Sequence, residues 1–130
     1  MGLAYEMGRT SMAKTEAKDR DGWLALFADD GLVQDPVGPS IFDPEGIGHQ
    51  GIVAITAFYD NVISTSESVR FDIRQWAECG SECAFAGTIQ IVLPGGQQGS
   101  VDLVNIYRVT DDGKIASLNS FWEFDMLSFS

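Results

Sequence analysis

The stretch WLALFADDGLVQDPVG, residues 23–38, joins an apolar helix pattern to a short apolar strand that ends in an acid. Apolar side chains recur at helical spacing over 22–28 and predict one buried face, formed by Trp23, Leu24, Phe27 and Ala28. Two acids and a glycine at 29–31 predict the end of this helix. A strand is then expected over 32–35, and Pro36 fixes a turn directly after Asp35. An acid between an apolar strand and a rigid turn is a candidate functional group.

The segments around this stretch predict an α+β fold. Alanines favour a helix over 4–18, and apolar residues at spacings of three and four predict another over 51–64. A strand fragment is expected near Ile41-Phe42. The period then changes to two, and turn signals separate strands expected at 69–77, 83–93, 99–110 and 114–124. Helices followed by a run of strands predict helices packed on one face of a curved, mostly antiparallel sheet.

Side-chain alternation predicts which residues face inward. In the strand 99–110, it groups Leu103, Asn105 and Tyr107 on one face. In the strand 69–77, strict alternation puts Trp76 on the face opposite to Phe71.

Composition limits the possible partners. The chain of 130 residues is expected to form one domain over 1–130, and its net charge of −11 disfavours nucleic acid and anionic membranes as partners. Its N-terminus lacks a signal-peptide pattern and no apolar run is long enough for a membrane helix, so a cytoplasmic location is expected. Cys79 and Cys83 are then expected to be free thiols, and with the single His49, expected to be solvent-exposed, they do not form a metal-ligand set.

Residues 23–38, with the motif Asp35-Pro36-Val37-Gly38, resemble the Δ5-3-ketosteroid isomerases of the NTF2-like/SnoaL-like superfamily, most closely the actinobacterial members. The resemblance continues at 55–59 and at 105–108 and extends over residues 19–124. It implies an NTF2-like cone, in which three N-terminal helices pack on a curved, mixed, mostly antiparallel sheet. Members of the family pair their sheets into homodimers, and the outward Val104 and Ile106 agree with such pairing.

The resemblance implies an isomerase that moves a double bond into conjugation with a ketone. In ketosteroid isomerase, an aspartate takes a proton from the carbon alpha to the carbonyl, and hydrogen-bond donors stabilise the oxyanion. Asp35 takes the position of this base, and the resemblance implies neither a metal nor an organic cofactor. Most Asp-Pro pairs only start a turn, so the role of Asp35 rests on the resemblance.

The oxyanion donors differ from the family's pair. The family's protonated aspartate corresponds to Asn105, whose amide can also donate. The family's first-helix tyrosine corresponds to Ser11, which is expected to be too short to reach the same oxygen. Tyr59 matches a tyrosine of the family's donor network, and is either a direct donor or a core residue.

The pocket is expected to take an apolar, steroid-like small molecule that bears a ketone or phenol oxygen. Its expected lining residues besides Asp35 are Trp122, Leu118, Ser120, Leu103 and Phe58. Trp122 is either core filler or a neighbour that raises the pKa of Asp35 by desolvation. Two other functions stay open: dehydratase, polyketide cyclase or epoxide hydrolase chemistry, and non-catalytic binding of a steroid-like or lipid-like molecule. The inward set contains no arginine, which an epoxide hydrolase of this fold would need.

Overall fold

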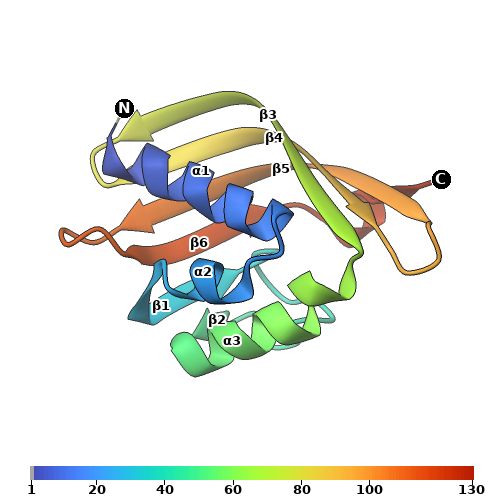
Figure 1. Ribbon diagram of the computed structural model, residues 1–130, viewed down its shortest axis with the longest axis horizontal. Coiled ribbons are helices and arrows are strands. Elements are labelled where there is room, and N and C mark those ends of the chain that lie inside the picture. Colours follow the sequence, from blue (N-terminus) through green and yellow to red (C-terminus); the bar gives the residue numbers. More distant parts are fainter. Residues whose placement is uncertain (1) are drawn as a thin grey trace.

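The computed structural model describes residues 2–130 (Figure 1). Its helical elements are α1 (Leu3–Glu16), α2 (Arg20–Leu24), α3 (Ile52–Asn61), η1 (Ile63–Thr65) and η2 (Phe124–Met126). Its strands are β1 (Phe27–Gln34), β2 (His49–Gln50), β3 (Ser68–Cys79), β4 (Glu82–Val92), β5 (Gln98–Val109), β6 (Ile115–Phe121) and β7 (Ser128–Phe129). No helix within residues 2–130 has the length and apolar character that a membrane crossing requires.

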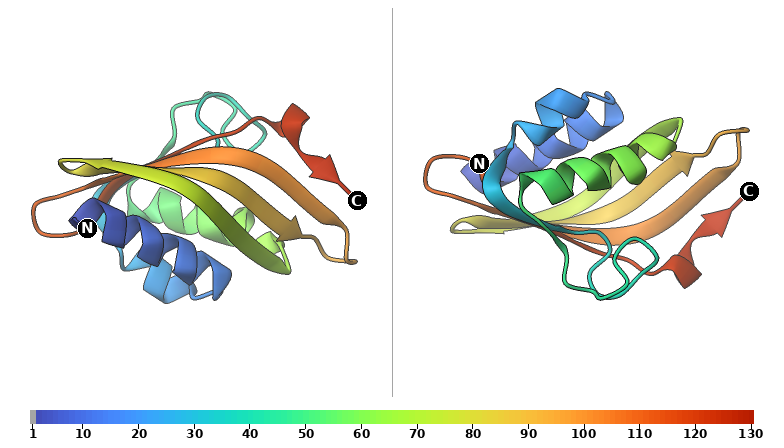
Figure 2. Two further views of the ribbon diagram at one scale, coloured as in Figure 1. Left: turned by 90° about the horizontal axis from the view of Figure 1, so that it is seen from above. Right: turned by 90° about the horizontal axis from the view of Figure 1, so that it is seen from below.

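The strands form one mixed sheet in the order β2-β1-β6-β5-β4-β3, and β7 adds a short pairing to β5. β1 and β6 run parallel, whereas the other neighbouring pairs are antiparallel. The sheet is strongly curved, and α1, α2 and α3 lie together against one of its faces (Figure 2). This architecture confirms the α+β fold expected from the sequence.

Packing of α1 depends on its small and uncharged inner face. Its buried residues recur at intervals of three and four positions, and are Ala4, Gly8, Ser11, Met12 and Thr15. Gly8 lies so close to β4 that a Cβ atom there would come within 2.4 Å of the Phe85 ring. The Glu78 carboxylate of β3 accepts hydrogen bonds from the backbone N–H groups of Gly2 (2.7 Å) and Tyr5 (2.8 Å). It thereby satisfies donors that a helix start leaves unpaired.

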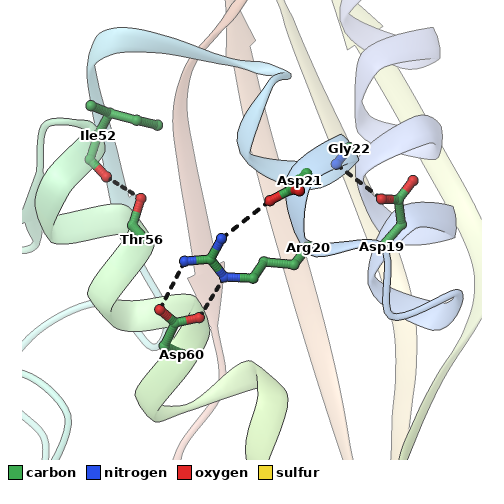
Figure 3. Close-up of polar contacts among 7 residues, drawn as sticks. All are labelled: Asp19, Arg20, Asp21, Gly22, Ile52, Thr56 and Asp60. Atoms are coloured by element: carbon green, nitrogen blue, oxygen red, sulfur yellow. Dashed lines mark hydrogen bonds and ion pairs between the residues drawn. The ribbon is translucent and has the colours of Figure 1, made fainter.

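An ion pair connects α2 to α3 (Figure 3). Two nitrogens of the Arg20 guanidinium contact the two oxygens of Asp60, at 2.7 and 3.0 Å. Asp19 begins α2 by accepting a hydrogen bond from the Gly22 N–H at 3.0 Å. These contacts hold Trp23 under α1, where it is almost completely buried.

The helix predicted over 22–28 is wrong in its second half. α2 ends at Leu24, and Phe27 already begins β1, where it pairs with Ile115 of β6. The register shifts between Phe27 and Leu32, and the acids at 29–30 lie exposed in this irregular part of the strand instead of ending a helix. Pairing with a strand more than 80 positions away overrides the local helical spacing. The fragment near Ile41-Phe42 forms only an isolated bridge, between Ser40 and Asp43.

The predicted direction of Trp76 is also wrong. A register shift lies between Ile73 and Gln75 in β3, and Arg74 is the additional residue. Such a bulge shifts the alternation of side chains by one position. Trp76 therefore turns to the helix side, where its ring centroid lies 4.5 Å from that of Tyr5.

The bulge depends on Gly87, which pairs with Ile73 on the neighbouring strand. A Cβ atom on Gly87 would lie 2.0 Å from the backbone oxygen of Asp72, which is far inside contact distance. We expect Gly87→Ala to lower the free energy of unfolding by about 2 kcal/mol or more, because backbone must move. Urea unfolding measures the change. Gly99→Ala is the matched control, because a Cβ there meets mainly the Phe129 ring near the chain end; equal losses in both variants would contradict the prediction.

Candidate active site

A cavity of about 350 Å³ lies between the sheet and the helices. Most of its wall consists of apolar side chains, many of them from β3, β4, β5 and the C-terminal segment. Asp35 and Asn105 both line it, together with four of the five other expected pocket residues: Phe58, Leu103, Leu118 and Trp122. Ser120 is buried just behind the wall. The polar groups of an otherwise apolar cavity set the orientation of a ligand.

Asp35 follows β1 directly and is held against the end of β6. Its Oδ1 atom accepts a hydrogen bond from the Trp122 indole Nε1 at 2.6 Å. Two residues further on, the Val37 N–H donates to the Ser120 carbonyl oxygen at 2.9 Å. The carboxylate is therefore positioned by backbone on one side and by an indole donor on the other.

Burial raises the pKa of the Asp35 carboxyl above its ordinary value. The hydrogen bond from Trp122 and the charge of His49 each lower this pKa, but burial has the larger effect. The Trp122 N–H points at the carboxylate and stabilises the ionised form, an effect opposite to the desolvation expected from the sequence. A raised pKa suits a carboxylate that must accept a proton near neutral pH.

Asn105 is buried on the inward face of β5, as alternation predicted. The Ser120 hydroxyl donates to its Oδ1 at 2.6 Å, which orients the amide. Its Nδ2 lies 3.9 Å from the Met12 sulfur, a weak acceptor. The amide N–H groups therefore keep donor capacity for a ligand in the cavity.

Sequence reasoning missed a second polar cluster in the cavity wall. The Ser11 Oγ lies 3.0 Å from both the Trp23 Nε1 and the Tyr107 hydroxyl oxygen, and all three side chains line the cavity. Burial raises the pKa of Tyr107, the negative charge of Asp35 raises it further, and the bond to Ser11 lowers it. Alternation had indicated the inward direction of Tyr107, but its partner lies 96 positions away in the sequence.

Tyr59 is buried but does not line the cavity. Its ring centroid lies 5.4 Å from that of Trp23. Burial raises its pKa, and the charges that act on it are those of Asp19, Arg20 and Asp60, the cluster in Figure 3. Of its two expected roles, the structure therefore supports core packing.

His49 is half-buried in β2, with its ring centroid 4.6 Å from that of Phe58. The expectation that it is solvent-exposed is therefore wrong. Its charge acts on Asp35, but its side chain does not line the cavity.

The sequence pattern of the SnoaL-like domain matches residues 9–118. The chain belongs to the SnoaL-like domain family. The chain is similar over its whole length to the whole chain of the Δ5-3-ketosteroid isomerase from Mycobacterium sp., with 32% identity and a TM-score of 0.93. It is also similar to RV0760c from Mycobacterium tuberculosis in complex with estradiol-17β-hemisuccinate, with 31% identity, a TM-score of 0.91, and coverage of 99% of this chain and 100% of that one. These similarities confirm the resemblance to ketosteroid isomerases and the NTF2-like fold.

Two further structures show what this fold accommodates. A computationally designed 17-OHP binder shares 31% identity over the full length of both chains, with a TM-score of 0.93. The epoxide hydrolase/cyclase-like enzyme SalBIII shares 18% identity and a TM-score of 0.82, covering 98% of this SnoaL-like chain and 95% of its own. At that identity, the similarity to SalBIII concerns the fold alone.

The pKa of Asp35 predicts how its replacement changes stability. Because the folded-state pKa is raised, folding disfavours the ionised carboxylate. Its contribution to stability is complete below the unfolded-state pKa of about 4 and is lost as pH rises through the folded-state pKa. We therefore expect Asp35→Asn to raise the melting temperature at about pH 8, with a gain that shrinks toward zero near about pH 3.5.

Thermal unfolding of both proteins across this pH range measures whether Asp35→Asn raises the melting temperature as expected. Asp111→Asn is the control, because it removes the same charge from an exposed turn. The stabilisation by Asp35→Asn could be independent of pH, or Asp111→Asn could reproduce it. Either result would contradict the conclusion that burial of the Asp35 carboxylate causes the stabilisation.

Proposed function

We propose that this SnoaL-like protein is a ketosteroid-isomerase-like enzyme. Asp35 takes a proton from the carbon alpha to a ketone and returns it at the allylic carbon, so that the double bond moves into conjugation. The observation that carries the proposal is a carboxylate with a raised pKa, fixed by the Trp122 N–H in the wall of an apolar cavity. The similarity to a mycobacterial Δ5-3-ketosteroid isomerase supports it.

The rest of the wall supports this chemistry. Removal of the alpha proton leaves negative charge on the ketone oxygen, and buried donors stabilise that charge. The Asn105 amide has N–H groups without a strong acceptor in the described part of the protein. The apolar wall suits a rigid hydrocarbon skeleton.

Isomerase activity provides the direct test. With a Δ5-3-ketosteroid, the conjugated product is followed by its ultraviolet absorbance. We expect Asp35→Asn to lower kcat by about 10²–10⁴-fold, because an amide cannot accept the proton. Asp111→Asn, in the exposed turn, should keep the wild-type rate. If wild type and Asp35→Asn are equally slow while both bind the steroid, the isomerase proposal fails.

The pH profile of kcat/KM tests the role of Trp122. The reaction needs ionised Asp35, so the rate falls on the acidic side as this carboxylate gains its proton. Trp122→Phe removes a donor that lowers the pKa of Asp35, and we expect the acidic limb to move to higher pH. Trp76→Phe, outside the cavity, should leave the limb in place. A shift to lower pH would contradict the role of the indole N–H.

Non-catalytic steroid binding is the second candidate function. It is favoured by Asn105, because an amide is a weaker donor than the neutral carboxylic acid of ketosteroid isomerase. Structures of RV0760c with estradiol-17β-hemisuccinate and of a designed 17-OHP binder support a steroid-like ligand. Dehydratase or cyclase chemistry is supported by the fold alone.

We also propose that the protein forms a homodimer through the outer face of its sheet. Val104 and Phe121 are 36% and 46% exposed. They pair with each other on neighbouring strands and line one shallow hollow. Burial of such an apolar surface would stabilise a dimer.

A further inference from the structure

The cluster of Trp23, Ser11 and Tyr107 connects α1, α2 and β5 at the cavity wall. Each of the three residues is at most 2% exposed. Trp23 Nε1 donates to Ser11 Oγ at 3.0 Å, and the hydroxyl groups of Ser11 and Tyr107 lie 3.0 Å apart. Neither hydroxyl group has another side-chain partner among residues 2–130. Buried polar side-chain atoms in proteins normally have at least one hydrogen-bond partner, and a buried donor proton without an acceptor costs free energy.

The number of protons in this cluster exceeds the number of bonds within it. An indole N–H can only donate, so Trp23 uses its one proton on Ser11. The two hydroxyl groups carry one proton each, and the bond between them uses only one. If Tyr107 donates to Ser11, the Ser11 proton stays free; if Ser11 donates to Tyr107, the Tyr107 proton stays free. In both arrangements, one hydroxyl proton has no acceptor in the described part of the chain.

We propose that the Ser11–Tyr107 hydroxyl pair is a hydrogen-bond donor for the ketone or enolate oxygen of the ligand. This inference rests on the proposed steroid-like ligand, and it adds Tyr107, a donor at a position that the resemblance does not assign. Both residues line the cavity, so a ligand bound there can accept a hydrogen bond from the unpaired hydroxyl proton. Trp23 is a positioning residue, because its donation orients the Ser11 oxygen without contact to the ligand oxygen.

The groups around the Ser11–Tyr107 hydroxyl pair favour its action as a hydrogen-bond donor rather than as an acceptor. Burial and the charge of Asp35 both raise the pKa of Tyr107, so its hydroxyl group keeps its proton. Tyr107 and Asn105 lie two positions apart on the same face of β5, and face Ser11 and Met12 of α1. The cavity therefore has donors on β5 and α1 and a carboxylate at the end of β1. A ligand with one accepting oxygen and an otherwise apolar skeleton matches this arrangement.

Binding of two steroids that differ in one oxygen tests the proposal. Androst-4-en-3-one carries a ketone, which can only accept hydrogen bonds, and androst-4-ene lacks it. The ratio of their Kd values measures the preference for the oxygen. We expect a wild-type preference of about tenfold or more for the ketone, and a loss of about tenfold in Ser11→Ala/Tyr107→Phe. Each single variant should lose less than the double, because the remaining hydroxyl group still has a proton to donate.

Two controls distinguish the hydroxyl pair from the other polar groups near the cavity. Tyr59→Phe removes the hydroxyl group of a buried tyrosine that does not line the cavity, and should keep the wild-type preference. Unchanged affinity for androst-4-ene shows that the double variant keeps its cavity. A double variant that retains the full ketone preference would overturn the proposal, as would complete loss of the preference in Asn105→Leu alone.

A crystal structure of the wild-type protein with androst-4-en-3-one gives a readout that needs no variant. The ketone oxygen should lie within about 3.2 Å of Ser11 Oγ or Tyr107 Oη, and an oxygen bound elsewhere would overturn the proposal. Asp35→Asn should keep the ketone preference while it removes turnover. If wild type shows no isomerase activity but the ketone preference depends on the hydroxyl pair, the donor stands and the proposed isomerase function fails.

Discussion

The parallel pairing of β1 with β6 is the constraint on which the site depends. Its register sets Val33 beside Leu118 and Gln34 beside Asn119. The next residue of the chain is Asp35, which this register brings to the end of β6, where the Trp122 N–H meets its carboxylate at 2.6 Å. A shift of one residue would turn every side chain of β1 to the other face. The same pairing joins the helical part of the chain to the antiparallel strands that form the cavity wall.

The Asp35 carboxylate is held between two opposing effects. Burial in an apolar wall raises its pKa, whereas the Trp122 indole N–H stabilises its ionised form. The Ser120 hydroxyl donates its one proton to Asn105, and its backbone carbonyl accepts from the Val37 N–H, so Ser120 connects the segment of the proposed base with the proposed oxyanion donor. A base needs both effects, because it must be ionised before reaction and must accept a proton during it.

The donor side of the cavity distinguishes this SnoaL-like protein from the ketosteroid isomerase pattern. By the resemblance, Ser11 and Asn105 correspond to the tyrosine and the protonated aspartate of the family. The short side chain of Ser11 leaves room for the Tyr107 hydroxyl, which lies 3.0 Å from its oxygen. A phenol thus remains in the cavity wall, but it comes from β5 instead of α1. In the proposed function, the cavity thus keeps a hydrogen-bond donor while the residues that supply it differ.

The sequence alone determined the features that depend on local pattern. These include the inward alternation of Leu103, Asn105 and Tyr107, the amphipathic spacing of α3 and the acid at the end of β1. Such features follow from the periods of a strand or a helix, which need no knowledge of a partner. Most of the predicted pocket residues follow from them, because a residue on the concave face of this sheet faces the cavity.

Only the tertiary structure decided which distant groups meet. Pairing with β6 makes Phe27 part of a strand, and a bulge opposite Gly87 turns Trp76 inward. Whether Tyr59 faces the cavity, whether Trp122 aims its N–H at Asp35, and whether Ser11 has a partner all depend on contacts between segments far apart in the chain. A hydrogen bond between positions 11 and 107 leaves no trace in local spacing, because its geometry exists only once α1 packs across the sheet.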